Sequence, residues 1–109
     1  MGDVIVVVPK GRLRGDKGTD ELTSTLRELV EHGEKKILLD LEKASIVGNR
    51  AIGALISIRV RAMKADSHFS MCNVDRRTRE FLTTMKLIEP LGIHGSRAEA
   101  LQALALLAG

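Results

Sequence analysis

Short apolar segments alternate along the chain with longer segments in which apolar residues recur every three or four positions. The short segments predict three main strands, at residues 4–8, 36–41 and 68–72. The first is β-branched and continuous up to Pro9, which is typical of a strand buried on both faces. Two shorter pieces, at residues 11–15 and 93–94, predict a short strand or turn and a short strand.

The first two predicted helices lie between these strands. Thr19 is the expected cap of the first helix, because the acidic pair that follows suits the positive end of the helix dipole. Its buried face is predicted from Leu22, Leu26, Leu29 and Val30, with Gly33 as its end. The second helix is predicted from Asn49 to about Lys64, with a buried stripe of Ile52, Leu55, Ile56, Val60 and Met63.

Two further helices are predicted in the last third of the chain. Either Asn73 or Asp75 is the expected cap of the third helix, whose buried residues are predicted to be Thr78, Phe81, Leu82 and Met85. Ser96 and Glu99 have the spacing of a capping box before the last helix, which carries an apolar stripe of Leu101, Leu104 and Leu107.

This order of elements predicts an α/β fold. Strands that alternate with helices imply right-handed crossovers, so we expect a mixed, mostly parallel sheet of 4–5 strands with about 4 helices. A chain of 109 residues suffices for one core, and no linker or repeat divides it, so residues 1–109 are expected to form one domain. Several small α/β folds share this order, which alone names no family.

The segment from Ser45 to Ile56 carries a more specific pattern. It follows the strand that ends in Asp40-Leu41 and runs through Gly48-Asn49-Arg50 into the second helix. This arrangement resembles the centre of a STAS domain, the fold of bacterial anti-sigma factor antagonists. Further similarities are Gly11-Arg12-Leu13 to an early Gly-x-Leu, residues 52–55 to Leu-Gly-Ala-Leu, Lys86-Leu87 to Gly-Leu, and residues 98–101 to a closing Glu-Ala-Leu.

The resemblance implies a protein that acts by binding partners rather than by catalysis. In switchable family members, an unmodified loop docks onto an anti-sigma factor that is also a serine kinase, and phosphorylation of a loop serine ends the association. That serine corresponds to Asn49, and the Asp before it corresponds to Gly48. An amide cannot accept a phosphoryl group as a hydroxyl does, so we expect no phosphorylation at Asn49.

Two compatible interpretations of Asn49 remain open. Asparagine is among the best N-terminal caps, so Asn49 can serve only to begin the second helix. It can also hold a docking loop permanently in its unmodified form. Ser45, Thr83 and Thr84 are other hydroxyl-bearing candidates, but no local pattern supports phosphorylation there.

The second helix is expected to have a basic face. One arc of the helix carries Arg50, Ala54, Ser57, Arg61 and Lys64. The predicted partner-binding residues are Gly48, Asn49, Arg50, Ile52, Gly53, Ser57 and Arg61. A solvated helix face remains the alternative interpretation.

Three other arginines cluster early in the third predicted helix, as Arg76, Arg77 and Arg79, where a solvated cluster is the expectation and an anion site the alternative. Arg59 lies near the centre of the apolar arc of the second helix. We expect its stem to cover apolar surface while its guanidinium reaches the edge of the sheet.

The composition limits the remaining classes of function. Two phenylalanines are too few for a base-stacking platform, so nucleic acid is not an expected partner. A single Cys72 in a predicted strand indicates a buried thiol and a cytoplasmic protein, and no segment is long and apolar enough for membrane insertion. His32, His68 and His94 lack ligand spacing, so neither a metal nor another cofactor is expected, and no catalytic motif is present.

The charge is uneven along the chain. Residues 1–49 carry 8 basic and 9 acidic side chains, whereas residues 50–109 carry 9 basic and 5 acidic ones. This asymmetry favours an acidic partner surface. The leading hypothesis is a non-enzymatic, anti-sigma factor antagonist-like protein that binds a kinase-type anti-sigma factor, of the histidine-kinase-like ATPase class, or another STAS signalling protein. The alternative is a STAS subunit that regulates an ABC or anion transporter.

Overall fold

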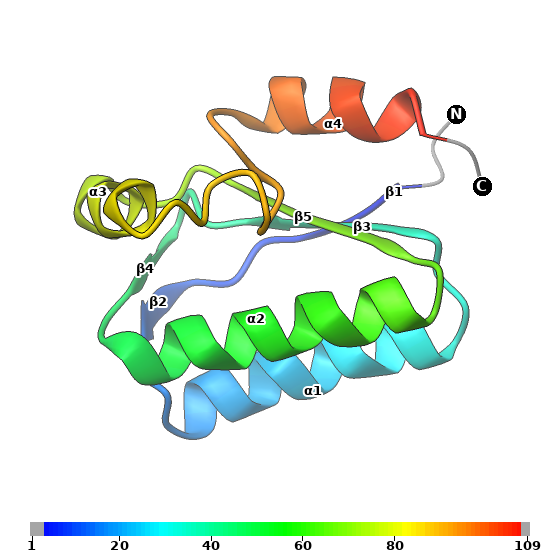
Figure 1. The fold of residues 1–109 in the computed structure, drawn as a ribbon. Helices are drawn as coiled ribbons and strands as arrows, with labels where there is room; N and C mark the ends of the chain where they lie inside the picture. The colour runs from blue at the N-terminus through cyan, green and yellow to red at the C-terminus, as the bar shows by residue number, and fades with distance from the viewer. Residues whose placement is uncertain (1–3, 108–109) are drawn as a thin grey trace.

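The computed structural model describes residues 4–107, which form helices packed on both faces of a sheet. Figure 1 shows α1 and α2 side by side under one face, α4 on the other, and α3 beyond the carboxyl ends of the central strands. In chain order the elements are β1 (Val4–Val7), β2 (Gly11–Leu13), α1 (Lys17–Glu31), β3 (Lys36–Asp40), β4 (Ala44–Ile46), α2 (Asn49–Lys64), β5 (His68–Cys72), α3 (Arg76–Thr84), β6 (Ile93–His94) and α4 (Arg97–Ala105).

The sheet confirms the α/β class and changes two details of the expectation. The main sheet has the order β1-β3-β5-β6, and β2 pairs with β4 in a second sheet. All four strand pairings are parallel, so the sheets are not mixed. The strand β4, which the sequence pattern did not predict, directly precedes α2 and pairs with β2 in the register Leu13 to Ile46.

The strand β1 is an edge strand rather than a strand buried on both faces. Its four residues are only half-buried, whereas all five residues of β3 are buried. The difference follows from position, because β3 has a neighbour on each side and β1 has one. A β-branched run therefore indicated a strand correctly but not its place in the sheet.

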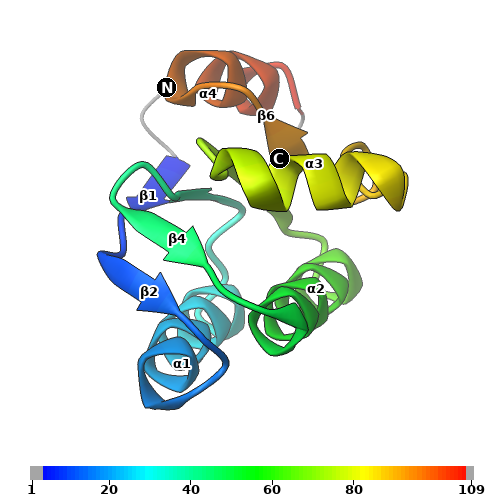
Figure 2. The same cartoon turned by 90° about the vertical axis from the view of Figure 1, so that its left-hand side faces the viewer.

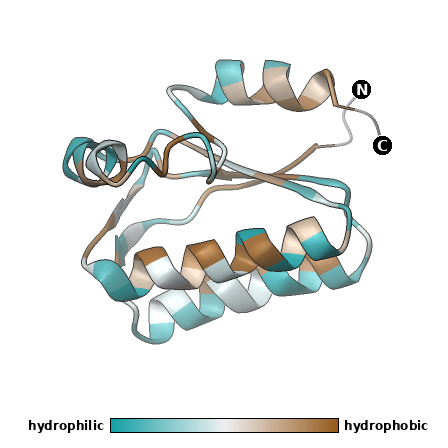
Figure 3. Cartoon of the chain, viewed as in Figure 1, coloured by the Kyte–Doolittle hydropathy of each residue, from teal (hydrophilic) through white to brown (hydrophobic). Residues whose placement is uncertain are grey.

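The core has two parts, one on each face of the main sheet. The larger part fills the space between the sheet, α1 and α2, with Leu26, Ile37 and Leu55 among its buried residues. The smaller part lies under α4, where Ala100 and Leu104 pack on Leu38 and Cys72. Figure 3 shows hydrophobic residues in the middle of α2 and hydrophilic residues at its start.

Several predicted buried residues are exposed. In α2, Val60 and Met63 are 44% and 62% exposed, because the stripe that contacts the sheet runs through Ala51, Leu55, Ile58 and Ala62 instead.

The predicted buried faces of α3 and α4 also differ from the structure. In α3, Phe81 and the C-terminal cap Met85 are exposed while Thr78 and Leu82 are buried. Leu107 lies beyond the end of α4 and is exposed, and within α4 Ala100 takes part in the buried face with Leu104. Small alanines allow closer helix packing, and a pattern that counts only large apolar residues misses them.

Two helix caps confirm the expectation and two do not. Asp75 caps α3 by accepting from the Thr78 amide (3.2 Å), and Ser96 caps α4 by accepting from the Glu99 amide (3.1 Å). Thr19 lies inside α1, which begins earlier at Lys17, and its hydroxyl accepts from the Gly15 amide. The second mistaken cap, Asn49, belongs to the candidate site.

Candidate partner-binding surface

The segment before α2 is held in place from both sides. On one side the Val47 amide donates to the carbonyl of Leu13 (2.8 Å), which extends the pairing of β4 with β2. On the other side the Ile46 amide donates to the Asp75 carboxylate (3.2 Å) at the start of α3. Figure 2 shows β4 beside β2 and leading into α2, with α3 nearby. The start of α2 is therefore positioned by elements far apart in the sequence.

The cap of α2 is Gly48 rather than Asn49. Gly48 has φ 84° and ψ 169°, a combination that is essentially restricted to glycine. Asn49 is the first residue of the helix, is exposed, and α2 has no side-chain cap. The interpretation of Asn49 as a helix cap is wrong, because the backbone turn that begins the helix occurs one residue earlier.

The loop between β2 and α1 touches the start of α2. Gly15 has φ 80°, and a Cβ added to it would overlap the Cβ of Arg50 and approach the backbone of Ala51 to 3.4 Å. Only a residue without a side chain permits this close approach. Gly15 thus allows α2 to begin against the β2–α1 loop, a role that the sequence pattern did not reveal.

Most of the predicted binding residues lie on the surface, but in two groups. Gly48, Asn49, Arg50 and Gly53 are exposed around the first turns of α2. Ser57 and Arg61 are exposed further along the helix, and Arg61 lies about 18 Å from Asn49 at 1.5 Å per residue. Ile52 differs, because it is half-buried and packs against the main core. Replacing Ile52 would therefore test the fold as much as binding.

The second group lines a shallow groove. Its lining residues are Ser57, Val60, Arg61, Lys64 and Ala65, and its volume is about 390 Å³. The helix itself contributes no acid to this face, but α1 does. Glu31 of α1 lies 3.6 Å from the guanidinium of Arg61, and both side chains are about half exposed. An exposed pair of this kind contributes little to stability, so Arg61 remains available for exchange with another carboxylate.

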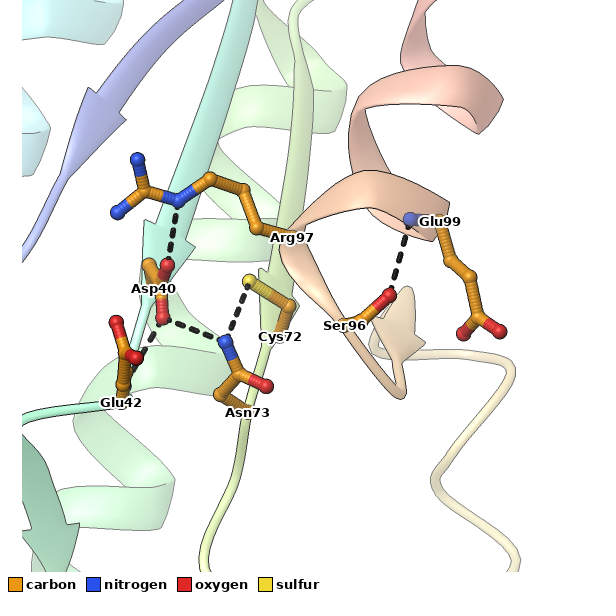
Figure 4. A network of polar contacts seen from close by, with 7 residues as sticks. All are labelled: Asp40, Glu42, Cys72, Asn73, Ser96, Arg97 and Glu99. Carbon is orange, nitrogen blue, oxygen red and sulfur yellow. Dashed lines mark hydrogen bonds and ion pairs between the residues drawn. The ribbon is translucent and has the colours of Figure 1, made fainter.

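The densest polar network lies elsewhere, at the carboxyl ends of β3 and β5. The Asp40 carboxylate is 1% exposed and accepts from the Glu42 amide (2.9 Å), the Asn73 side chain (3.0 Å) and the Arg97 guanidinium (2.7 Å). Figure 4 shows the three donors around Asp40, with Cys72 beside Asn73. The ion pair ties the start of α4 to the central strand of the sheet.

These contacts set the charge states in the network. Burial alone would raise the pKa of Asp40, but the hydrogen bonds from Asn73, Arg97 and the Glu42 amide hold that pKa below its ordinary value. Burial and the nearby Asp40 charge raise the pKa of Cys72 to about 11. Cys72 is therefore a buried, protonated thiol at neutral pH, and the expectation of a buried thiol is confirmed.

The other arginines are accounted for by local contacts. The Arg59 guanidinium donates to the carbonyl of Phe69 at the edge of β5 and lies against Gly92, as expected from its position on α2. Burial lowers the pKa of Arg59. In α3, Arg76 pairs with Glu80 (3.2 Å), and the Asp75 carboxylate already occupies the first-turn amide of Thr78. This arrangement favours a solvated arginine cluster over an anion site.

A signal for the Asp40 network was present in the sequence. Asp40 ends one buried strand and Asn73 directly follows the next, and the carboxyl ends of parallel strands meet at one edge of a sheet. Arg97 carries no comparable signal, because its contact with Asp40 spans 57 residues.

Within residues 4–107 no cluster of His, Cys, Asp or Glu has the arrangement of a metal site. No helix in that range has the length and hydropathy needed to cross a bilayer.

Comparisons with solved structures identify the fold. A candidate anti-sigma factor antagonist from Thermotoga maritima superposes with a TM-score of 0.83 at 19% identity, over 96% of this chain and 90% of that chain. The phosphorylated form of the Bacillus cell fate determinant SpoIIAA gives 0.71 at 13% identity, over 94% and 92%. The STAS domain of a Vibrio cholerae SulP transporter gives 0.72 at 12% identity, over 94% and 81%.

The chain therefore has the STAS fold, and the resemblance inferred from the sequence is confirmed for the fold. No model of a protein family matches the sequence, and no curated protein matches it. Solved structures with this fold include both anti-sigma factor antagonists and transporter domains. The fold alone therefore does not decide between these functions.

Proposed function

We propose that this protein is a non-enzymatic regulatory binding protein of the anti-sigma factor antagonist type, a single cytoplasmic domain over residues 1–109. Its partner is a kinase-type anti-sigma factor, of the histidine-kinase-like ATPase class, or another STAS signalling protein. The partner contacts the first turns of α2, where Gly48, Asn49, Arg50 and Gly53 are exposed. No residue of this surface transfers a group to or from the partner.

The observation that carries the proposal is Gly53. It lies within α2, where glycine lowers helix stability by roughly 0.5–1 kcal/mol relative to alanine. A Cβ at this position would meet nothing within 4 Å, so the fold itself does not require glycine. Gly53 lies on the same face of the helix as Arg50. An open glycine on this face supports the close approach of another surface.

Asn49 supports a partner interaction that is not switched by phosphorylation at this position. The resemblance aligns Asn49 with the family's phosphoacceptor serine, and Asn49 is exposed, as an acceptor would have to be. Its side chain lacks a hydroxyl. The preceding Gly48 adopts a backbone conformation that the family's aspartate would adopt only under strain. The chain therefore differs from the family's pattern at the residue before the acceptor as well as at the acceptor.

The alternative function, regulation of an ABC or anion transporter, has one specific observation in its favour. The STAS domain of a SulP transporter and a sulfate transporter family protein from Wolinella succinogenes share this fold, with TM-scores of 0.72 and 0.74. A partner identified as a transporter ATPase or permease would establish this alternative and exclude the leading proposal.

The test is capture of the partner from a lysate of the source organism with the tagged protein as bait. Mass spectrometry should identify a histidine-kinase-like ATPase that the wild-type protein captures and the Arg50→Glu, Gly53→Glu variant does not. Both positions are exposed, so the variant keeps the core intact. Capture of the same ATPase by the variant would place the contact elsewhere.

A second assay tests the phosphorylation state. Incubation with the captured ATPase and ATP should leave residues 45–57 free of phosphate, as measured by mass spectrometry of the peptides. The matched variant Asn49→Ser restores a hydroxyl at the exposed position without changing Gly48. Phosphate on the wild-type segment would contradict the proposal.

A further inference from the structure

The groove on the second half of α2 combines positive charge with apolar surface. Arg61 and Lys64 lie on it, and among residues 4–107 no carboxylate forms an ion pair with Lys64. Val60 lines the groove beside them and is 44% exposed. A surface that combines cations with an exposed apolar side chain is suited to a protein contact.

We infer that this groove binds an acidic, amphipathic helix of a partner protein. The inference goes beyond the proposed function, because it concerns a second surface, whose Arg61 lies about 18 Å along α2 from Asn49. Ser57, Val60, Arg61 and Lys64 follow the spacing i, i+3, i+4 and i+7, which forms one row on the helix surface. A second helix can pack along such a row, with small Ser57 and Ala65 allowing close approach.

The charges favour an acidic occupant. Among the described residues, Glu31 of α1 is the one carboxylate that pairs with Arg61, at 3.6 Å, and both side chains are about half exposed. A carboxylate on the incoming helix can replace Glu31 at Arg61 and form a new pair with Lys64. The exposed Val60 supplies an apolar contact for the apolar face of the partner helix.

A groove on α3 provides a matched comparison. It is about 470 Å³ in volume and is lined by Arg76, Arg79, Glu80, Thr83 and Thr84. It carries two arginines, as the α2 groove carries two cations, but its own Glu80 pairs with Arg76 at 3.2 Å. No large apolar side chain lines it. Similar basic charge is thus present without the apolar part.

Nucleic acid fits the α2 groove less well than an acidic helix. No aromatic side chain lines the groove, so bases have nothing to stack on, and Glu31 lies beside the basic residues. A duplex would also make no use of the exposed Val60. Tighter binding of a DNA duplex than of the acidic helix at this groove would therefore overturn the inference.

The experiment titrates the full chain with three fluorescent helical peptides. The first has leucines on one face flanked by glutamates, the second is a permutation of the same composition without amphipathic order, and the third replaces each glutamate with lysine. The first should bind and shift the backbone NMR signals of residues 57–65. The Arg61→Gln, Lys64→Gln variant should weaken binding by about tenfold or more.

Matched variants distinguish a specific helix contact on α2 from a general attraction to basic charge. Arg76→Gln with Arg79→Gln removes the same charge from α3 and should leave the affinity unchanged. Val60→Gln should weaken binding while keeping both cations. Equal binding of the permuted peptide, no binding of the first peptide, or tighter binding of a DNA duplex at the same residues would each overturn the inference. Failure of the Arg50 surface in the capture experiment would leave this result unaffected.

Discussion

The carboxyl ends of β3 and β5 and the start of α2 are both polar, but their side chains are used in opposite ways. The Asp40 carboxylate is buried and accepts from three donors, so little of it is left for a ligand. At the start of α2, Asn49 and Arg50 are exposed and the helix has no side-chain cap. The contrast indicates that the most connected polar cluster maintains the fold, while the sparsely bonded surface is available for binding.

The largest expected effect comes from removing the carboxylate at Asp40. The substitution Asp40→Ala leaves the Asn73 and Arg97 side chains and the Glu42 amide without their acceptor. Loss of hydrogen bonds to a charged group costs about 1.5–3 kcal/mol. Urea unfolding monitored by circular dichroism should show this decrease in the free energy of unfolding. An unchanged midpoint would mean that the network does not hold α4 to the sheet.

The same network predicts a dependence on acid. The pKa of Asp40 is lower in the folded protein than in the unfolded chain, so its contribution to stability is complete above about pH 4. That contribution is lost as the pH falls through the lower, folded pKa. The wild-type protein should therefore lose more stability below pH 4 than the Asp40→Asn variant, measured by urea unfolding at several pH values. Parallel losses in both proteins would contradict this assignment.

A smaller effect is expected at Gly48. Its backbone conformation is essentially restricted to glycine, so Gly48→Ala should lower the free energy of unfolding by about 1–3 kcal/mol through strain. Open space surrounds the added Cβ, so a steric clash would not contribute. Thermal unfolding measures the change. No loss in the free energy of unfolding, or a gain as at loop positions where alanine fits without strain, would show that the loop relaxes freely.

Gly53 is expected to separate stability from binding. Gly53→Ala should raise the free energy of unfolding by roughly 0.5–1 kcal/mol, because it removes the entropic disadvantage of glycine within a helix. Gly53→Glu should keep the protein folded but block the partner. Thermal unfolding and the capture experiment together test this separation. If both variants bind as tightly as wild type, no surface approaches α2 closely at this position.

Cys72 has a buried thiol whose pKa is raised to about 11, and its prediction involves no change in stability or in binding. The native protein at neutral pH should react with a thiol reagent far more slowly than the urea-unfolded chain does. A spectroscopic thiol assay measures both rates. Fast labelling of the native protein would show that the edge of β5 near Asp40 opens readily.

Much of the fold was predictable from the sequence because it depends on local patterns. The strand at 68–72 agrees with β5 throughout, and the predicted range of α2 agrees with Asn49–Lys64. The strand β4 was not predicted, since its three residues are paired with β2 through contacts distant in sequence. The edge position of β1 also depends on the order of strands, which periodicity does not contain.

The candidate surface was predictable in part. The exposure of Asn49 and Arg50 followed from the pattern of α2, but the cap at Gly48 depends on a backbone angle that residue types alone did not reveal. The supports provided by Gly15 and Asp75 come from other elements and carried no local signal. Glu31 beside Arg61 was missed for the same reason, because it belongs to α1.

A binding titration of the captured partner against two variants of this protein decides whether the start of α2 is the binding surface. The Arg50→Glu, Gly53→Glu variant alters the exposed start of α2, and Asp40→Asn alters the buried network. If the partner binds at the start of α2, the first variant should lose about tenfold or more in affinity while unfolding like wild type. Asp40→Asn should bind as wild type does at a temperature where it is folded. Unchanged affinity of the first variant would contradict the assignment of this surface.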